Sequence, residues 1–234
     1  MKKFFLLLFL LPAMVAAQEK IVVNLSSGEQ LYDKVTFEMQ YVLPEFKEGL
    51  VYFKDGRRIK SMLNYNVLLG EMHFIDEREN ILALGSLKDI LVVVIDSKRF
   101  FPFKDAEFCE ELLVKEDARL CVRRIGNVAE YSKMGAYGMN QSLASIQTFN
   151  TVVSDNSRIH KTKWMGEVRL SVDTIYYAMN KKGKYTQIKN LKSITKLFSG
   201  SGNSAKIEAF VKENNTDFTI KDDLVALVEF CSNL

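Results

Sequence analysis

The sequence predicts a mainly β (α+β) fold, with an antiparallel meander, sandwich or barrel-like body followed by a C-terminal helical unit. Short apolar or alternating segments recur from residue 20 to residue 125, separated by turn-forming residues roughly every ten positions. No helical segment between them is long enough for the crossover that parallel strands need. After residue 190 the apolar residues recur at intervals of three and four, which is the spacing of helices.

The N-terminal residues have the order of an export signal. Lys2 and Lys3 are positive, residues 4–11 are continuously apolar, and Val15-Ala16-Ala17 supplies small residues at a cleavage site. The apolar run is far shorter than the roughly 20 residues of a membrane-spanning helix, which disfavours an uncleaved anchor; a buried N-terminal helix is the other alternative. We therefore expect cleavage before Gln18 and no transmembrane segment afterwards. The mature protein is expected in the periplasm, the cell envelope or the extracellular space.

These patterns divide the chain into four regions. Residues 1–17 are the expected signal peptide and residues 18–125 a β-rich region. Residues 126–161 are expected to form a loop or linker rich in Gly, Ser and Asn, and residues 162–234 a β-hairpin followed by helices. The strand order, and whether the mature protein has one domain or two, stay open.

The β-rich region is expected to consist of consecutive hairpins. The clearest has Asp55-Gly56 at its turn, because this dipeptide suits the positive φ angles of a tight turn. Five consecutive aliphatic residues at 91–95 indicate a strand buried on both faces or nearly so. The expected strands are 21–23, 32–41, 50–53, 58–65, 71–75, 81–84, 91–95, 99–103, 109–114 and 120–125.

Residues 126–161 contain the candidate contacts with a ligand or partner. Small residues without strong periodicity are typical of a long loop or flap. Tyr131, Tyr137 and Met139 are the large side chains within it that are suited to stacking on a sugar or a partner protein. The alternative is that these side chains only pin the loop to the body.

The C-terminal region is expected to begin with a strand over residues 166–179, a turn at 180–183 and a returning strand at 185–188. Three helices should follow, and their expected capping residues are Asn190, then Ser204, then Thr219 or Asp222. The last helix carries one apolar stripe, formed by Leu224, Leu227, Val228 and Cys231.

Charge and cysteine content limit the classes of partner. The net charge of +3 includes Lys2 and Lys3, so the mature protein is nearly neutral and its bulk charge attracts neither nucleic acid nor anionic lipid. The three cysteines, if exported, reach a compartment where disulfides form. Cys109 and Cys121 flank a turn at diagonal rather than opposed positions, so a disulfide between them stays open. Cys231 is expected to act as a buried small hydrophobic residue.

No motif predicts a catalytic, metal or cofactor site. His73 and His160 are the only histidines, and a metal centre needs three or four converging ligands. His73 alternates with apolar neighbours, which predicts a solvent-facing position or a polar contact. The acidic residues that could act in pairs are Glu107, Glu110, Glu111, Asp222 and Asp223. A solvated strand face explains the first three, and the dipole of a helix N-terminus explains the last two.

Several motifs carry a resemblance to a known group of proteins. They are residues 50–56, Leu63-Asn64-Tyr65-Asn66, residues 71–75, residues 82–84, Arg99-x-Phe101 and, near the C-terminus, Ile207-x-x-Phe210-Val211-Lys212. Together they resemble an uncharacterised group of exported β-rich proteins of Gram-negative bacteria. The resemblance implies an envelope or periplasmic location, and it carries no activity and no site residues.

These observations favour an exported, soluble envelope protein without catalytic activity or cofactor that binds a partner protein or a glycan. One alternative is an exported hydrolase whose site assembles from residues remote in sequence. Another is an accessory subunit of an outer-membrane assembly that docks through exposed apolar strand edges. A pocket with two carboxylates, or with a cysteine and His160, would favour the hydrolase, and an open aromatic surface would favour binding. The sequence does not predict the oligomeric state.

Overall fold

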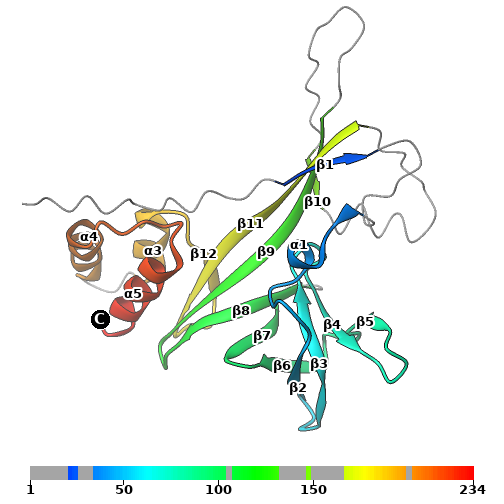
Figure 1. Ribbon diagram of the computed structural model, residues 1–234. Coiled ribbons are helices and arrows are strands. Elements are labelled where there is room, and N and C mark those ends of the chain that lie inside the picture. The colour runs from blue at the N-terminus through cyan, green and yellow to red at the C-terminus, as the bar shows by residue number, and fades with distance from the viewer. Residues whose placement is uncertain (1–20, 26–33, 104–106, 132–145, 149–165, 199–201) are drawn as a thin grey trace, which may run out of the picture.

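The computed structural model describes residues 21–25, 34–103, 107–131, 146–148, 166–198 and 202–234 (Figure 1). The strands are β1 (Ile21–Leu25), β2 (Lys47–Phe53), β3 (Arg58–Asn66), β4 (Glu71–Ile75), β5 (Ile81–Ala83), β6 (Ile90–Ile95), β7 (Lys98–Phe103), β8 (Glu107–Val114), β9 (Ala118–Tyr131), β10 (Ile146–Thr148), β11 (Gly166–Asn180) and β12 (Tyr185–Gln187). The helices are α1 (Phe37–Gln40), α3 (Leu191–Leu197), α4 (Asn203–Glu213) and α5 (Lys221–Ser232).

All of these strands belong to one antiparallel sheet. Its main path has the order β1-β11-β9-β8-β7-β6-β2-β3-β4-β5, with β10 beside β9 and β12 beside β11. The path does not close on itself, so β1 and β5 lie at its two edges. The prediction of a mainly β, antiparallel meander with C-terminal helices is confirmed, in the open form rather than as a barrel.

Local turn chemistry explains where strands β2 and β3 end. Gly56 has φ +88° in the turn between β2 and β3, as the Asp-Gly pair predicts. At the end of β3, the Asn66 Oδ1 atom accepts hydrogen bonds from the backbone N–H groups of Leu68 (3.1 Å) and Leu69 (3.0 Å). A short amide side chain thus ends the strand and starts the turn that leads into β4.

Two expectations about the strands are wrong. Residues 37–40 form helix α1 rather than the middle of a strand over 32–41, because the Gln40 side chain folds back to donate to the Val35 carbonyl (3.1 Å). Strand β9 continues to Tyr131 instead of ending at residue 125, since pairing with β11 supplies backbone hydrogen bonds regardless of side-chain pattern. Residues 91–95 are nearly buried on both faces, as predicted: Val92, Val93 and Ile95 are buried, and Leu91 at the start is 56% exposed.

Two hydrophobic cores lie along the sheet. The first surrounds Leu63 and Phe100, where β3 packs against the central strands. The second joins Leu120 of β9 to Leu224 and Leu227 of α5, so the C-terminal helices cover one end of the β9–β11 ribbon (Figure 1). Each fully buried aliphatic side chain of this kind stabilises the fold by about 1.5–3 kcal/mol.

The helical unit follows its sequence signals with small shifts in where the helices begin. Asn190 caps α3 through a capping box with Ser193, as predicted. Helix α4 is capped by Gly202 rather than Ser204, and α5 begins at Lys221 after the cap residue Ile220. The predicted apolar stripe of α5 is buried throughout, and Asp222 and Asp223 lie in its first turn as expected: the buried residues are Leu224, Leu227, Val228 and Cys231.

Close backbone packing brings the β3–β4 turn onto β9. A Cβ atom at Gly126 would lie 2.6 Å from both the Cα and the carbonyl oxygen of Leu68, so only glycine fits. Within the described part of the chain, no helix combines the length and apolarity needed to cross a membrane.

Candidate functional site

The residues predicted to contact a ligand lie at the limit of the described structure or outside it. Tyr131 is the last residue of β9, where it pairs with Glu167 of β11. Tyr137 and Met139 lie outside the described residues, as does His160. Their roles stay predictions.

Cys109 and Cys121 are free thiols in a small buried cluster with Phe103 and Tyr177. Cys121 lies opposite Glu111 in the β8–β9 ladder. Cys109 is two residues before Glu111 on β8, so it lies diagonally to Cys121, as predicted from the position of the turn. The hydrogen bond to Cys109, together with burial, raises the pKa of Cys121 far above its ordinary value. A buried, protonated thiol is a poor nucleophile, so the surroundings of Cys121 do not favour nucleophilic catalysis.

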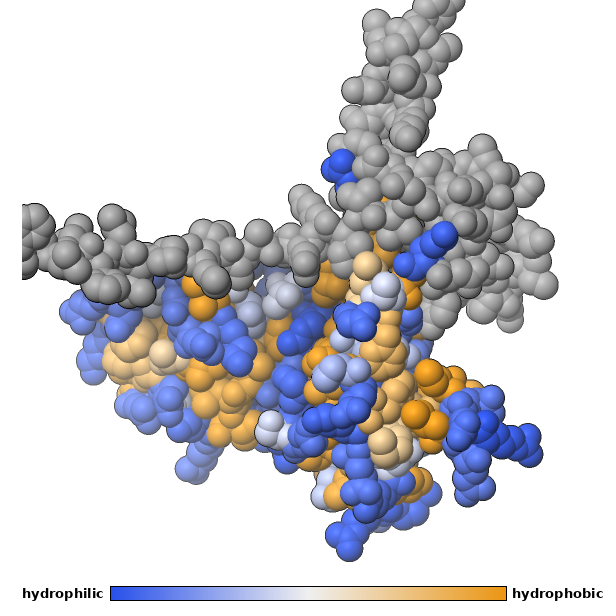
Figure 2. Space-filling model, in the orientation of Figure 1, coloured by the Kyte–Doolittle hydropathy of each residue, from blue (hydrophilic) through white to orange (hydrophobic). Residues whose placement is uncertain are grey.

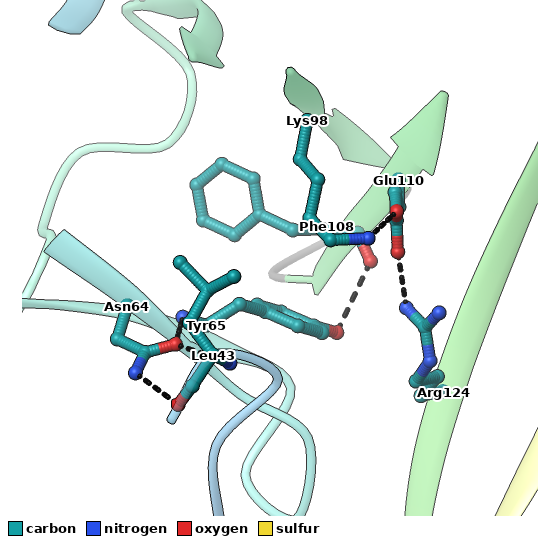
Figure 3. A network of polar contacts seen from close by, with 7 residues as sticks. All are labelled: Leu43, Asn64, Tyr65, Lys98, Phe108, Glu110 and Arg124. Carbon is teal, nitrogen blue, oxygen red and sulfur yellow. Dashed lines mark hydrogen bonds and ion pairs between the residues drawn. The ribbon is translucent and has the colours of Figure 1, made fainter. Parts of the chain in front are cut away.

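The acidic residues of β8 form salt bridges, so the prediction that they lie on a solvated strand face is wrong. Glu110 is 5% exposed, and its carboxylate accepts hydrogen bonds from Lys98 Nζ (2.5 Å) and Arg124 Nη1 (2.6 Å) (Figure 3). These three side chains come from β8, β7 and β9 and join adjacent strands. The neighbouring pairs are Glu111–Arg99, Glu111–Arg119 and Glu107–Arg123.

The charges of this network favour the ionised form of Glu110. Burial by itself raises the pKa of Glu110, but the charge of Arg124 and the hydrogen bonds from Lys98 and Arg124 outweigh it, and the pKa is lowered overall. Glu110 is therefore ionised at neutral pH and unsuited to donate a proton. Beside it, the Tyr65 hydroxyl donates to the Phe108 carbonyl (3.3 Å), and burial raises the pKa of Tyr65, so the hydroxyl stays protonated (Figure 3).

His73 is buried in β4 and makes two polar contacts. Its Nδ1 atom lies 2.8 Å from the Tyr41 hydroxyl and its Nε2 atom 3.1 Å from Glu71 Oε2. The polar contact was predicted, whereas the solvent-facing alternative is wrong because His73 is 6% exposed. In the neutral ring, Nε2–H donates to the carboxylate and Nδ1 accepts from the tyrosine. Among the described residues, no three His, Cys, Asp or Glu side chains converge as metal ligands.

An open groove of about 440 Å³ lies between the α1 segment and strands β3 and β4. Most of its lining is apolar or aromatic, and two carboxylates lie on the α1 side. The lining residues are Phe37, Glu38, Pro44, Glu45, Phe46, Met62 and Ile75.

Asn64 of β3 fixes the segment that forms one wall of the groove. Its Oδ1 atom accepts from Leu43 N (3.1 Å), and its Nδ2 atom donates to the carbonyls of Leu43 (2.9 Å) and Glu45 (3.1 Å) (Figure 3). Because Asn64 is fully buried, its amide satisfies these backbone groups with little competition from water. The wall therefore holds its shape without regular secondary structure.

Aromatic packing fixes the same wall from the inside. The ring of Tyr41 lies 4.5 Å from that of Phe37 and 5.2 Å from that of Phe46, measured between centroids. Tyr41 is itself oriented by its hydrogen bond to His73. The buried histidine thus acts on the groove indirectly, by positioning the two phenylalanines that line it.

A row of apolar side chains leads from the groove to the edge of the sheet. Met62 of β3 is opposite Ile75 of β4, and Ile75 is opposite Ile81 of β5. Met62 is 42% exposed and Ile81 50% exposed. Figure 2 shows hydrophobic surface over the β4–β5 hairpin, next to a hydrophilic hairpin tip. The groove and the edge strand therefore form one continuous apolar surface.

Docking through an apolar strand edge was one of the alternatives that the sequence left open, but the groove was not predicted. Alternation over residues 32–41 predicted a strand there, so the wall of the groove could not be recognised. The only available signal was the apolar run of residues 81–83 between two polar turns, and the sequence did not show that this strand lies at an edge.

Comparisons of the chain with protein-family models, with curated proteins and with solved structures found no match. The class of protein is therefore defined by the fold and the surface alone: an open antiparallel meander with a helical unit at one end and an apolar groove and edge strand at the other.

Proposed function

We propose that this chain is an exported envelope protein without catalytic activity that binds a partner protein through the groove and strand β5. The observation that carries the proposal is the apolar row Met62–Ile75–Ile81, which continues the groove to a sheet edge where no further described strand pairs. Contiguous exposed apolar surface with a polar surround is typical of protein interaction sites.

The chemistry of the groove supports binding over hydrolysis. Glu38 and Glu45 give the groove the two carboxylates that the hydrolase alternative requires, but a glycoside hydrolase also needs one carboxyl group with a raised pKa. Hydrogen bonds from its own backbone N–H and from Thr36 lower the pKa of Glu38 instead. Two exposed carboxylates, one of them with a lowered pKa, are suited to attract a basic partner rather than to protonate a leaving group.

The same lining supports a protein partner over a glycan. A sugar presents hydroxyl groups that need both donors and acceptors beside the stacking ring. The side chains lining this groove offer carboxylate acceptors and apolar atoms but no polar N–H or O–H donor. Phenylalanine, methionine and isoleucine instead fit the apolar side chains of another protein.

Site-specific photo-crosslinking in native cells tests the proposal. A benzophenone amino acid in place of Met62 should give one discrete adduct whose partner is identified by mass spectrometry. Ile59 is the matched control, because it lies on the same strand with similar exposure (50%) but outside the groove. Absence of an adduct at Met62, or the same adducts at both positions, would contradict partner binding at this surface.

Export is tested separately by N-terminal sequencing of the protein from native cells. A start at Gln18 in the fraction released by opening the envelope supports the proposed location. An intact Met1 in the cytosolic fraction would contradict it.

A further inference from the structure

We propose that strand β5 recognises its partner by strand addition: an extended segment with a short apolar run flanked by lysine or arginine pairs with Ile81–Ala83 and continues the sheet. This inference rests on the proposed function and specifies the recognition mode and the chemistry of the partner.

The backbone of β5 is arranged for such pairing. Asp76 N donates to Asn80 O (3.0 Å) and Leu84 N donates to Met72 O (2.8 Å), which fixes the hydrogen-bonded pairs of the β4–β5 ladder. In antiparallel pairing these pairs alternate with pairs whose N–H and C=O groups point away from the partner strand. Ile81 and Ala83 are the residues in the outward positions.

These outward groups are available. β5 is the last strand of the main sheet path, and none of the backbone hydrogen bonds between described residues outside the ladders involves Ile81 or Ala83. Two N–H and two C=O groups therefore lie along the edge, at the spacing of an incoming strand.

The side chains of β5 would be covered on both faces by an added strand. Ile81 extends the row that starts at Met62, and Leu82 extends the row formed on the opposite face by Leu63 and Phe74. Ile81 and Leu82 are 50% and 44% exposed. Natural edge strands are usually protected by charges, proline or a covering segment, and β5 contains no charged residue or proline. The partner segment should therefore be apolar where it lies beside β5.

The charges around β5 indicate which residues should flank the apolar run of the partner segment. The turn before β5 contains Asp76, Glu77 and Glu79 against one cation, Arg78. Hydrogen bonds from Asn80 lower the pKa of Asp76, so this carboxylate is ionised at neutral pH. The groove adds two further carboxylates. In an antiparallel pair of two β5 strands, the acidic turn of each copy would lie beside residues 84–89 of the other, where Lys88 is offset by Asp89. That segment has no net positive charge, so charge complementarity favours a different, basic protein.

A labelled peptide tests the mode of binding directly. The probe is fluorescein–Lys-Lys-Val-Ile-Val-Lys-Lys, titrated with the mature protein while anisotropy is measured. We expect saturable binding, about tenfold weaker for the peptide with glutamate in place of lysine. Methylation of the backbone N–H groups on one edge of the peptide should abolish binding, while methylation on the other edge should leave it intact.

Two variants of the protein make the test specific. Ala83→Pro removes an outward N–H and leaves the pairing of Leu82 with Phe74 in place, so it should weaken peptide binding at least about tenfold. Ala83→Val keeps the N–H and is the matched control, with binding expected within about threefold of the unmodified protein. Circular dichroism and the melting temperature report whether the proline variant is folded, and the N-methylated peptides test the inference without it.

The outcomes separate this inference from the proposed function. A crosslinked partner at Met62, together with no peptide binding or with binding insensitive to N-methylation and to Ala83→Pro, would overturn strand addition and leave partner binding in place. No crosslinked partner and no peptide binding would overturn both. A dimer detected by light scattering and lost in Ala83→Pro would identify a second copy as the occupant and overturn the basic partner.

Discussion

Replacing Glu110 by glutamine tests how much the buried ion network contributes to the sheet. The substitution preserves the shape of the side chain and removes the negative charge that lies between Lys98 and Arg124. Hydrogen bonds to charged groups contribute about 1.5–3 kcal/mol each, and removing one member of a buried pair costs about 3–5 kcal/mol. Lys98 and Arg124 are 34% and 23% exposed, so water compensates them in part. We expect the free energy of unfolding to fall by about 2–3 kcal/mol.

Denaturant unfolding at neutral pH measures this loss as a lower midpoint with an unchanged slope. The matched control is Glu48→Gln, because the ion pair between Glu48 and Lys60 is 64% and 63% exposed. That control should change stability by less than about 0.5 kcal/mol. If the Glu110 variant lies within the same range as the control, the network does not stabilise the fold and the reasoning is refuted.

The pH dependence gives an independent check. The pKa of Glu110 is lowered from its ordinary value of 4.5, so its stabilisation is complete above that pH and is lost as the pH falls through the lower, folded-state pKa. The stability difference between wild type and Glu110→Gln should therefore be constant near neutrality and shrink in acid. A difference that grows as the pH falls would contradict the assignment.

Three further predictions follow from single contacts. Gly126→Ala should lower the melting temperature by several degrees or prevent folding, because its Cβ meets the Leu68 backbone at 2.6 Å, whereas Gly85→Ala, with open space around it, should have little effect in the same thermal scan. Asn190→Ala should cost about 1 kcal/mol in denaturant unfolding, as expected for a lost helix cap; an unchanged midpoint would argue against the capping box. Cys231 should resist alkylation at pH 8 until the protein is unfolded, since burial raises its pKa to about 12, and rapid labelling of the native protein would contradict its buried position.

Local sequence patterns predicted most of the strands and the C-terminal helices. Asp55-Gly56 forms the turn between β2 and β3, and Asn190 caps a helix through atoms three residues away. The apolar stripe of α5 has the spacing of a helix face and is buried as predicted. These features depend on contacts within a few residues, so the sequence alone contains them.

The environment of each polar residue was much less predictable. Alternation along β8 placed Glu110 on a solvated face, yet the curved sheet brings Lys98 and Arg124 to both sides of it and closes off the water. His73 likewise became a buried contact because the α1 segment crosses over β4 and supplies Tyr41. Burial depends on what other segments cover, and periodicity within one strand does not report this.

The sequence by itself determined the export-like N-terminus, the succession of short strands and turns, and the helical character of the last 45 residues, 190–234. Tertiary structure decided which strands are edges, how the α1 segment forms a wall of the groove, and which charges are paired. The physical reason is the range of the interactions: turns, caps and amphipathic stripes are set by neighbours along the chain, whereas the order of strands in an antiparallel sheet joins residues that are distant in sequence. The proposed function depends on the position of β5 at the open edge. That position is set by contacts between residues distant in sequence.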